Sequence, residues 1–183
     1  KDEGLSTGAS IIFITPDSER TMCTYLGISS HLSANDIDEQ YIKDKQLVFL
    51  EGYLWDKGIS EKMFNHVINI AKKNSVKIAM SLSDIFCVKR HREDFLKLLI
   101  SDLDILISNE NEINELMSVN NLQDSVEKLK QINKLTIITL GEKGSLAVQN
   151  HQVTSCDSIK VDNLVDLTGA GDLFASGFLK EYL

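Results

Sequence analysis

The strongest chemical signal in this sequence is a run of small residues placed directly before an expected C-terminal helix. Gly169, Ala170 and Gly171 carry almost no side chain, and Asp172 follows them in the first helical turn. Small residues let a ligand approach the backbone closely, and the first N–H groups of a helix attract anionic oxygens. A carboxylate beside a phosphate site suits a base that takes a proton from an attacking hydroxyl. An ordinary glycine-rich helix start, with Asp172 complementing the helix dipole, explains the pattern equally well.

Two further segments place polar and small residues after expected strands. Thr139, Gly141 and Gly144 follow or end a strand-like run, where their backbone and hydroxyl groups suit contacts to a nucleotide. A glycine-containing turn is the commoner explanation for that segment. Asn109 and Glu112 follow a buried strand, where an amide and a carboxylate suit a hydrated Mg²⁺. A capped helix start explains this pair at least as well.

A fourth segment, Glu51-Gly52-Tyr53-Leu54-Trp55-Asp56, follows the first core strand. Its two aromatic side chains suit either the lining of a pocket or the covering of a core, which is the more frequent role of aromatic residues. The three cysteines lie far apart in the sequence without C-x-x-C spacing, which argues against a zinc site or a disulfide framework. We therefore expect the three cysteines to be reduced thiols, which are typical of a cytoplasmic protein.

Length and composition restrict the class of protein. The chain has 183 residues, 43% of them apolar and 25% charged, as in ordinary globular proteins. No apolar run approaches the roughly 20 residues of a membrane-spanning helix, so we expect no membrane association. The net charge of −8 argues against a protein that coats nucleic acid. The negative net charge does not exclude a local phosphate-binding site, since such a site needs only a few N–H groups.

The elements that must position these residues fall into two parts. Two β-rich runs at 10–14 and 21–26 flank the only proline, Pro16, and predict a β-hairpin. From residue 46 onward, short apolar strands alternate with amphipathic helices, which predicts a mainly parallel sheet covered on both faces. The expected strands are 47–50, 77–80, 104–107, 136–140 and 145–148, and the expected helices lie near 60–71, 95–99, 113–117, 122–129 and 169–183.

The order of these segments resembles the PfkB/ribokinase family of carbohydrate and nucleoside kinases. That order is a hairpin, E-G-Y, N-x-x-E, T-x-G-x-x-G and finally D-x-x-G-A-G-D, of which the last motif is highly specific. Leu167 departs from the family pattern, which usually has Thr or a small residue there. The resemblance implies an α/β, ribokinase-like, three-layer α/β/α fold with a mainly parallel sheet. It also implies part of a β-sheet lid over residues 1–40, a nucleotide-binding and catalytic core over 41–183, and a fragment incomplete at both ends.

The resemblance further implies an enzyme, a phosphotransferase that moves the γ-phosphate of ATP to a primary hydroxyl of a sugar or nucleoside. Asp172 would be the catalytic base. Gly169, Ala170 and Gly171 would form the anion hole for the transferred phosphate.

Other motif positions carry over in the same way. Asn109 and Glu112 match the N-x-x-E motif that positions Mg²⁺ through water. Thr139, Gly141 and Gly144 match the nucleotide-binding turn.

The phosphate acceptor is a separate question. The segments 51–56 and 20–27 look most like the adenosine-kinase-like branch, with ribose, fructose or another sugar as the alternative.

The resemblance also bears on cations and partners. The positions of Asp166 and Thr168 hold a monovalent cation such as K⁺ in some members, and the lid allows a homodimer. We assign Arg20 no role beyond surface charge. A non-catalytic nucleotide-binding regulatory module is the alternative from another class, although the retained Asp172 argues against it.

Overall fold

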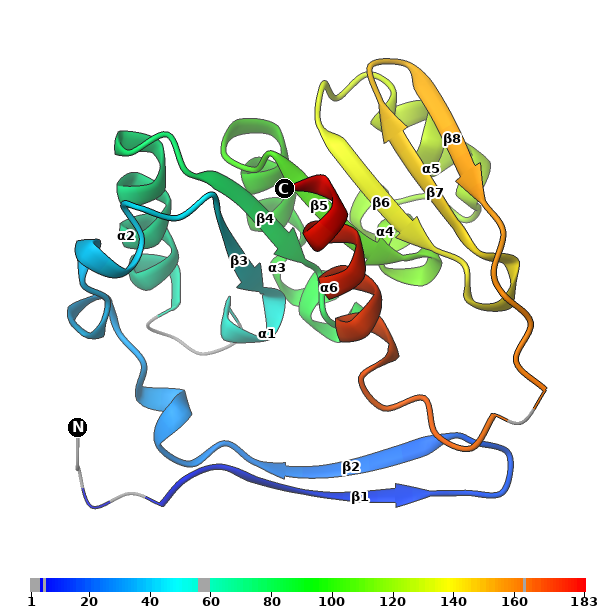
Figure 1. The fold of residues 1–183 in the computed structure, drawn as a ribbon, viewed down its shortest axis with the longest axis horizontal. Coiled ribbons are helices and arrows are strands. Elements are labelled where there is room, and N and C mark those ends of the chain that lie inside the picture. Colours follow the sequence, from blue (N-terminus) through cyan, green and yellow to red (C-terminus); the bar gives the residue numbers. More distant parts are fainter. Residues whose placement is uncertain (1–3, 5, 56–59, 163) are drawn as a thin grey trace. The chain divides into compact units, whose positions relative to one another are not determined.

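The computed structural model describes residues 4, 6–55, 60–162 and 164–183 (Figure 1). They form two compact units, which we describe separately: residues 33–159, and residues 1–32 together with 160–183. Asp56, the last residue of the predicted E-G-Y segment, lies outside the described residues. The predicted functional division into a lid over 1–40 and a core over 41–183 stays a prediction.

A six-stranded sheet organises the unit formed by residues 33–159. Its strand order follows the chain order, with parallel pairing through the first four strands and antiparallel pairing through the last two steps (Figure 1). This arrangement confirms the mainly parallel sheet. The strands are β3 (Leu47–Glu51), β4 (Lys77–Ser81), β5 (Ile105–Asn109), β6 (Leu135–Thr139), β7 (Ser145–Gln149) and β8 (Gln152–Cys156).

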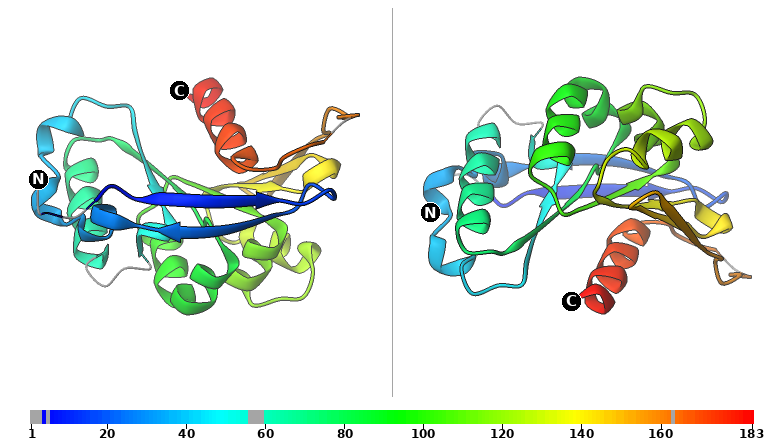
Figure 2. Two further views of the ribbon diagram at one scale, coloured as in Figure 1. Left: turned by 90° about the horizontal axis from the view of Figure 1, so that it is seen from below. Right: turned by 90° about the horizontal axis from the view of Figure 1, so that it is seen from above.

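Helices connect the parallel strands of this sheet. Neighbouring parallel strands joined by right-handed crossovers place their helices on a common face, and Figure 2 shows α3, α4 and α5 gathered on one side of the sheet. The polar groups at the carboxyl ends of the parallel strands therefore share one edge. The helices are α1 (Gly52–Trp55), α2 (Ser60–Lys73), α3 (Ile85–Ser101), α4 (Glu110–Met117) and α5 (Leu122–Leu129).

The expected short helix at 95–99 is wrong in length, because α3 begins at Ile85. The side chain of Asp84 caps the helix by accepting a hydrogen bond from Phe86 N at 2.6 Å. Cys87 and Val88 of the first half are buried, and non-helical backbone angles at His91 separate the two halves. The kink hid the common helical periodicity of the two halves.

The core of this unit includes Trp55, only 9% exposed, from the E-G-Y segment. Its ring packs edge-on against Phe64 of α2 and Phe95 of α3, with ring centroids 5.0 and 6.1 Å apart. Tyr53, by contrast, is exposed. The two predicted roles were lining a pocket and covering the core, and Trp55 has the second role.

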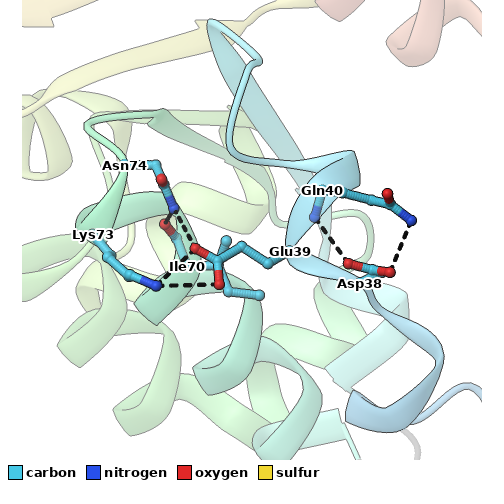
Figure 3. A network of polar contacts seen from close by, with 6 residues as sticks. All are labelled: Asp38, Glu39, Gln40, Ile70, Lys73 and Asn74. Atoms are coloured by element: carbon cyan, nitrogen blue, oxygen red, sulfur yellow. Dashed lines mark hydrogen bonds and ion pairs between the residues drawn. The ribbon is translucent and has the colours of Figure 1, made fainter.

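Short 3-10 turns, η2 (Ala34–Asp36) and η3 (Glu39–Tyr41), precede β3. Figure 3 shows how η3 is fixed to the C-terminal end of α2. Glu39 accepts hydrogen bonds from Lys73 Nζ at 2.9 Å and from Asn74 Nδ2 at 3.2 Å. These contacts lower the pKa of Glu39, first through Lys73 and then through Asn74.

The other unit contains the predicted hairpin, which is confirmed. Strand β1 (Ala9–Ile14) pairs antiparallel with β2 (Arg20–Tyr25), and the turn is closed by Thr15 N donating to Glu19 O at 2.9 Å. A 3-10 turn, η1 (Gly27–His31), follows the hairpin, and the C-terminal helix α6 (Ala170–Tyr182) completes the unit. The hairpin exposes several large apolar side chains: Ile11, Ile12, Phe13, Ile14, Met22 and Tyr25.

Candidate active site

The G-A-G-D segment forms the start of α6, as the sequence predicts. Gly169 has φ +77° and ψ 4°, a left-handed conformation that glycine adopts without a Cβ penalty. A Cβ placed on Gly169 would lie 3.9 Å from Oδ2 of Asp172, so this carboxylate lies close above the glycine. Apart from its chain neighbours and the nearby backbone of its own helix, no atom of the described residues lies within 4 Å of a Cβ placed on Gly171. The backbone here is therefore open to close approach, with a carboxylate beside it.

The N–H groups of this helix start differ in availability. Ala170 N donates to Leu167 O at 3.1 Å, which closes the turn in front of the helix. Within the part of the chain that the structure describes, the N–H groups of Gly171 and Asp172 have no hydrogen-bond acceptor. These two N–H groups can thus donate hydrogen bonds to an anionic oxygen. The N–H group of Ala170 can do so only if its hydrogen bond to Leu167 O breaks.

Asp166 and Thr168 form a turn immediately before the glycines. Thr168 N donates to Asp166 Oδ1 at 2.8 Å. The pKa of Asp166 is lowered first by hydrogen bonds from the side chain and backbone of Thr168 and then by the charge of Arg20. Asp166 is therefore held as a carboxylate, and the predicted use of this turn for a monovalent cation stays a prediction.

Asn109 and Glu112 form a reciprocal capping box at the start of α4. Glu112 N donates to Asn109 Oδ1 at 2.9 Å, while Asn109 N donates to Glu112 Oε2 at 2.9 Å and Asn109 Nδ2 to Oε1 at 2.6 Å. Glu112 is only 6% exposed. Burial raises the pKa of Glu112, with a smaller contribution from the charge of Asp84, against the hydrogen bond from the Asn109 backbone. The alternative of a capped helix start is thus confirmed as local structure.

A magnesium role is compatible with this box only through water. Each carboxylate oxygen of Glu112 accepts one hydrogen bond from Asn109, which leaves lone pairs unused. Among the described residues, no group of three or more His, Cys, Asp or Glu is arranged to hold a metal ion. Mg²⁺ usually keeps several waters and binds one or two carboxylates together with substrate phosphates. Glu112 fits that mode.

The T-x-G-x-x-G segment joins β6 to β7 through the 3-10 turn η4 (Gly141–Lys143). Its first residue, Thr139, lies opposite Asn109 in the register of β5 and β6. Gly141 has φ +60°, and beyond its chain neighbours no atom in the described part of the chain lies within 4 Å of a placed Cβ. Gly144 has φ +92°, and its Cβ would lie 2.0 Å from Cys156 O. The fold therefore requires glycine at 144, while the backbone at 141 stays open.

The structure brings the predicted residues together in two groups. Asn109, Glu112 and Thr139 meet at the carboxyl edge of the sheet in the unit 33–159. The residues of the D-x-x-G-A-G-D motif belong to the other unit, which also contains the hairpin. Sequence reasoning missed Ser18, whose Oγ donates to Leu164 O at 2.7 Å, and the influence of Arg20 on Asp166. Contacts over such a sequence separation have no local signal.

Comparison with known proteins decides the family. A family model described as "pfkB family carbohydrate kinase" matches residues 1–183. The chain belongs to this family. Among solved structures, the adenosine kinase from Sinorhizobium meliloti is 37% identical with a TM-score of 0.92, over 96% of this chain and 54% of that chain. A probable sugar kinase from Rhizobium etli CFN 42 is 35% identical with a TM-score of 0.91, over 96% of this chain and 53% of that chain.

A curated relative extends the comparison. Adenosine kinase of Schizosaccharomyces pombe is 24% identical over 197 residues, which are 97% of this chain and 57% of that protein. The predicted ribokinase-like fold and the likeness to adenosine kinases are confirmed. This pfkB-family chain spans about half the length of the relatives it matches. No helix of its described residues is long and apolar enough to cross a membrane.

Proposed function

We propose that the protein containing this chain is an ATP-dependent kinase that phosphorylates a primary hydroxyl group of an adenosine-like nucleoside. The observation that carries the proposal is the start of α6 in a chain of the pfkB family. There, Asp172 lies close above Gly169, and the N–H groups of Gly171 and Asp172 are open to an anion. A base and an oxyanion site side by side suit phosphoryl transfer to an alcohol.

In this reaction Asp172 accepts the proton of the acceptor hydroxyl as its oxygen bonds to the γ-phosphorus. The bond from the γ-phosphorus to the bridging oxygen breaks, and ADP leaves with the electron pair. The N–H groups at the start of α6 stabilise negative charge on the transferred phosphoryl group, together with the positive end of the helix dipole. Gly169 and Gly171 allow that approach because they place no side chain over the backbone.

In this proposal, residues of the unit 33–159 contact the nucleotide. The open backbone at Gly141 and the hydroxyl of Thr139 suit contacts to ATP, and Glu112 and Asn109 would hold water around Mg²⁺. A bound Mg²⁺ neutralises charge on the phosphates. K⁺ at Asp166 and Thr168, and a homodimer through residues 1–40, stay predictions.

The acceptor is proposed from the relatives. Several of the matched proteins are named adenosine kinase, and one of these is 37% identical to this chain. A sugar is the second candidate, because the family is described as carbohydrate kinases and a 35% identical structure is a probable sugar kinase.

Release of ADP from ATP and Mg²⁺ by the full-length protein tests the proposal, with adenosine, ribose and fructose as acceptors. Adenosine is expected to give the highest kcat/KM. Replacement of Asp172 by Asn is expected to lower kcat by about 10²–10⁴-fold, the usual contribution of a general base, and to leave ATP affinity unchanged. The exposed side chain makes a stability loss small. Turnover of Asp172→Asn within tenfold of the wild type would refute the assigned base. ATP binding without turnover of any acceptor would favour a non-catalytic regulatory module.

A further inference from the structure

The tip of the β1–β2 hairpin is bonded to the segment that leads into the G-A-G-D motif. Ser18 Oγ donates to Leu164 O at 2.7 Å, and the two residues are 146 positions apart in the sequence. Ser18 is only 8% exposed, whereas every residue of β1 and β2 is exposed. The hairpin thus buries one polar side chain, and that side chain carries this hydrogen bond.

Hydrogen bonds stiffen both sides of this contact. On the hairpin side, Ser18 N donates to Thr15 O at 2.9 Å, and Asp17 Oδ1 accepts from Glu19 N at 3.2 Å. The turn holds Ser18 at φ +65°, a conformation that is uncommon for residues other than glycine. Such a backbone cost is retained where surrounding contacts impose it.

On the helix side, short-range hydrogen bonds run from Leu164 toward the anion-binding backbone. Two residues after Leu164, Asp166 Oδ1 accepts from Thr168 N at 2.8 Å. The next bond, Ala170 N to Leu167 O at 3.1 Å, leads into the first turn of α6. The charge of Arg20 at the start of β2 makes a small contribution to lowering the pKa of Asp166, after the hydrogen bonds from Thr168.

We propose that Ser18 is a positioning residue that orders the 164–168 loop, and through it the N–H groups at the start of α6, by holding the loop to the hairpin turn. The kinetic consequence rests on the proposed kinase function. Since the hairpin and α6 belong to one compact unit and the nucleotide turn to the other, loss of the contact affects phosphate transfer and the acceptor more than ATP affinity.

Two substitutions of Ser18 separate positioning from stability. Ser18→Ala removes the hydroxyl and keeps the backbone cost of the positive φ. Ser18→Gly also removes the hydroxyl but relieves that cost. Ser125→Ala is the matched control, because Ser125 is fully buried and its Oγ donates to Asn114 Oδ1 at the same 2.7 Å, between α4 and α5.

Steady-state kinetics with the preferred acceptor and hydrogen exchange of the full-length protein are the two measurements. Both Ser18 variants are expected to lower kcat/KM for the acceptor by about two- to tenfold, the factor that one hydrogen bond supplies, with ATP affinity unchanged. Ser18→Gly is expected to melt no lower than Ser18→Ala, while Ser125→Ala lowers the melting temperature and keeps kcat/KM. Faster amide exchange is expected at 164–170 in both Ser18 variants and not in Ser125→Ala.

The kinetic and exchange measurements distinguish failure of the proposed function from failure of the positioning role of Ser18. If the wild type phosphorylates no acceptor, the proposed function fails, and the exchange at 164–170 still decides the positioning role. If exchange at 164–170 is unchanged in both Ser18 variants, the inference is overturned. A kcat/KM that follows melting temperature across all three variants would overturn it as well, because the effect would then be one of stability alone.

Discussion

The two glycines of the turn between β6 and β7 should lose stability to very different extents when each is replaced by alanine. At Gly144, an alanine Cβ would lie 2.0 Å from Cys156 O and 2.9 Å from the backbone of Asp157. Its φ of +92° and ψ of −132° are open almost only to glycine. A strained backbone costs about 1–3 kcal/mol, and an overpacked contact about 1–3 kcal/mol more. The expected loss for Gly144→Ala is therefore about 2–6 kcal/mol.

Gly141→Ala is the matched comparison. Gly141 also has a positive φ, of +60°, but among the residues that the structure describes no atom beyond its chain neighbours lies within 4 Å of a placed Cβ. Only the left-handed backbone penalty of about 1–2 kcal/mol remains. Its methyl group would instead cover backbone that we assign to ATP, so we expect Gly141→Ala to weaken ATP binding by more than its effect on stability suggests.

Urea unfolding followed by circular dichroism, and titration of ATP onto the folded full-length proteins, measure the two effects. Gly144→Ala is expected to lower the unfolding midpoint strongly, and Gly141→Ala to lower it slightly and raise the Kd for ATP. Equal midpoints for the two variants would refute the steric reasoning at Gly144. An unchanged Kd for ATP in Gly141→Ala would refute the assignment of that backbone to the nucleotide.

Two further substitutions test the unit 33–159. Burial raises the folded-state pKa of Glu112, so its contribution to stability is most favourable below the unfolded pKa of about 4.3 and declines as the pH rises through the folded pKa. The free energy of unfolding of the wild type, relative to Glu112→Gln, should therefore fall as the pH rises above the unfolded pKa, and a constant difference in urea titrations would contradict this. Trp55→Ala should cost about 3–5 kcal/mol through loss of the ring contacts to Phe64 and Phe95. Circular dichroism must follow the unfolding, since Trp55 is the only tryptophan, and a loss below about 1 kcal/mol would show that the site repacks.

Periodicity and turn chemistry predicted most of the fold. The hairpin followed from two β-rich runs around Pro16, and the parallel strands followed from compact apolar runs such as 104–107. The sequence did not predict β8 (Gln152–Cys156), because all five of its residues are exposed and it has no apolar alternation with a buried face. The first half of α3 was missed because the kink at His91 interrupts the helical pattern.

The candidate site was predicted unevenly. Asn109 and Glu112 were found by their spacing, and the structure shows why spacing alone is ambiguous: the same residues form a capping box. Gly141 and Gly144 looked equivalent in sequence and differ in their surroundings. Ser18 was not predicted, since nothing near residue 18 indicates a bond to Leu164. Local patterns therefore identified candidate residues, and tertiary contacts distinguish their roles.

The discontinuous unit has a consequence for synthesis on the ribosome. Its hairpin is made first, whereas Leu164, the acceptor for Ser18, follows 146 residues later. At about 5–20 residues per second, that interval lasts roughly 7–30 seconds. The intervening residues 33–159 are continuous and can fold while the chain is still growing. Throughout this time the hairpin turn lacks the acceptor of Ser18, so the contact between Ser18 and Leu164 forms only after residues 33–159 have been made.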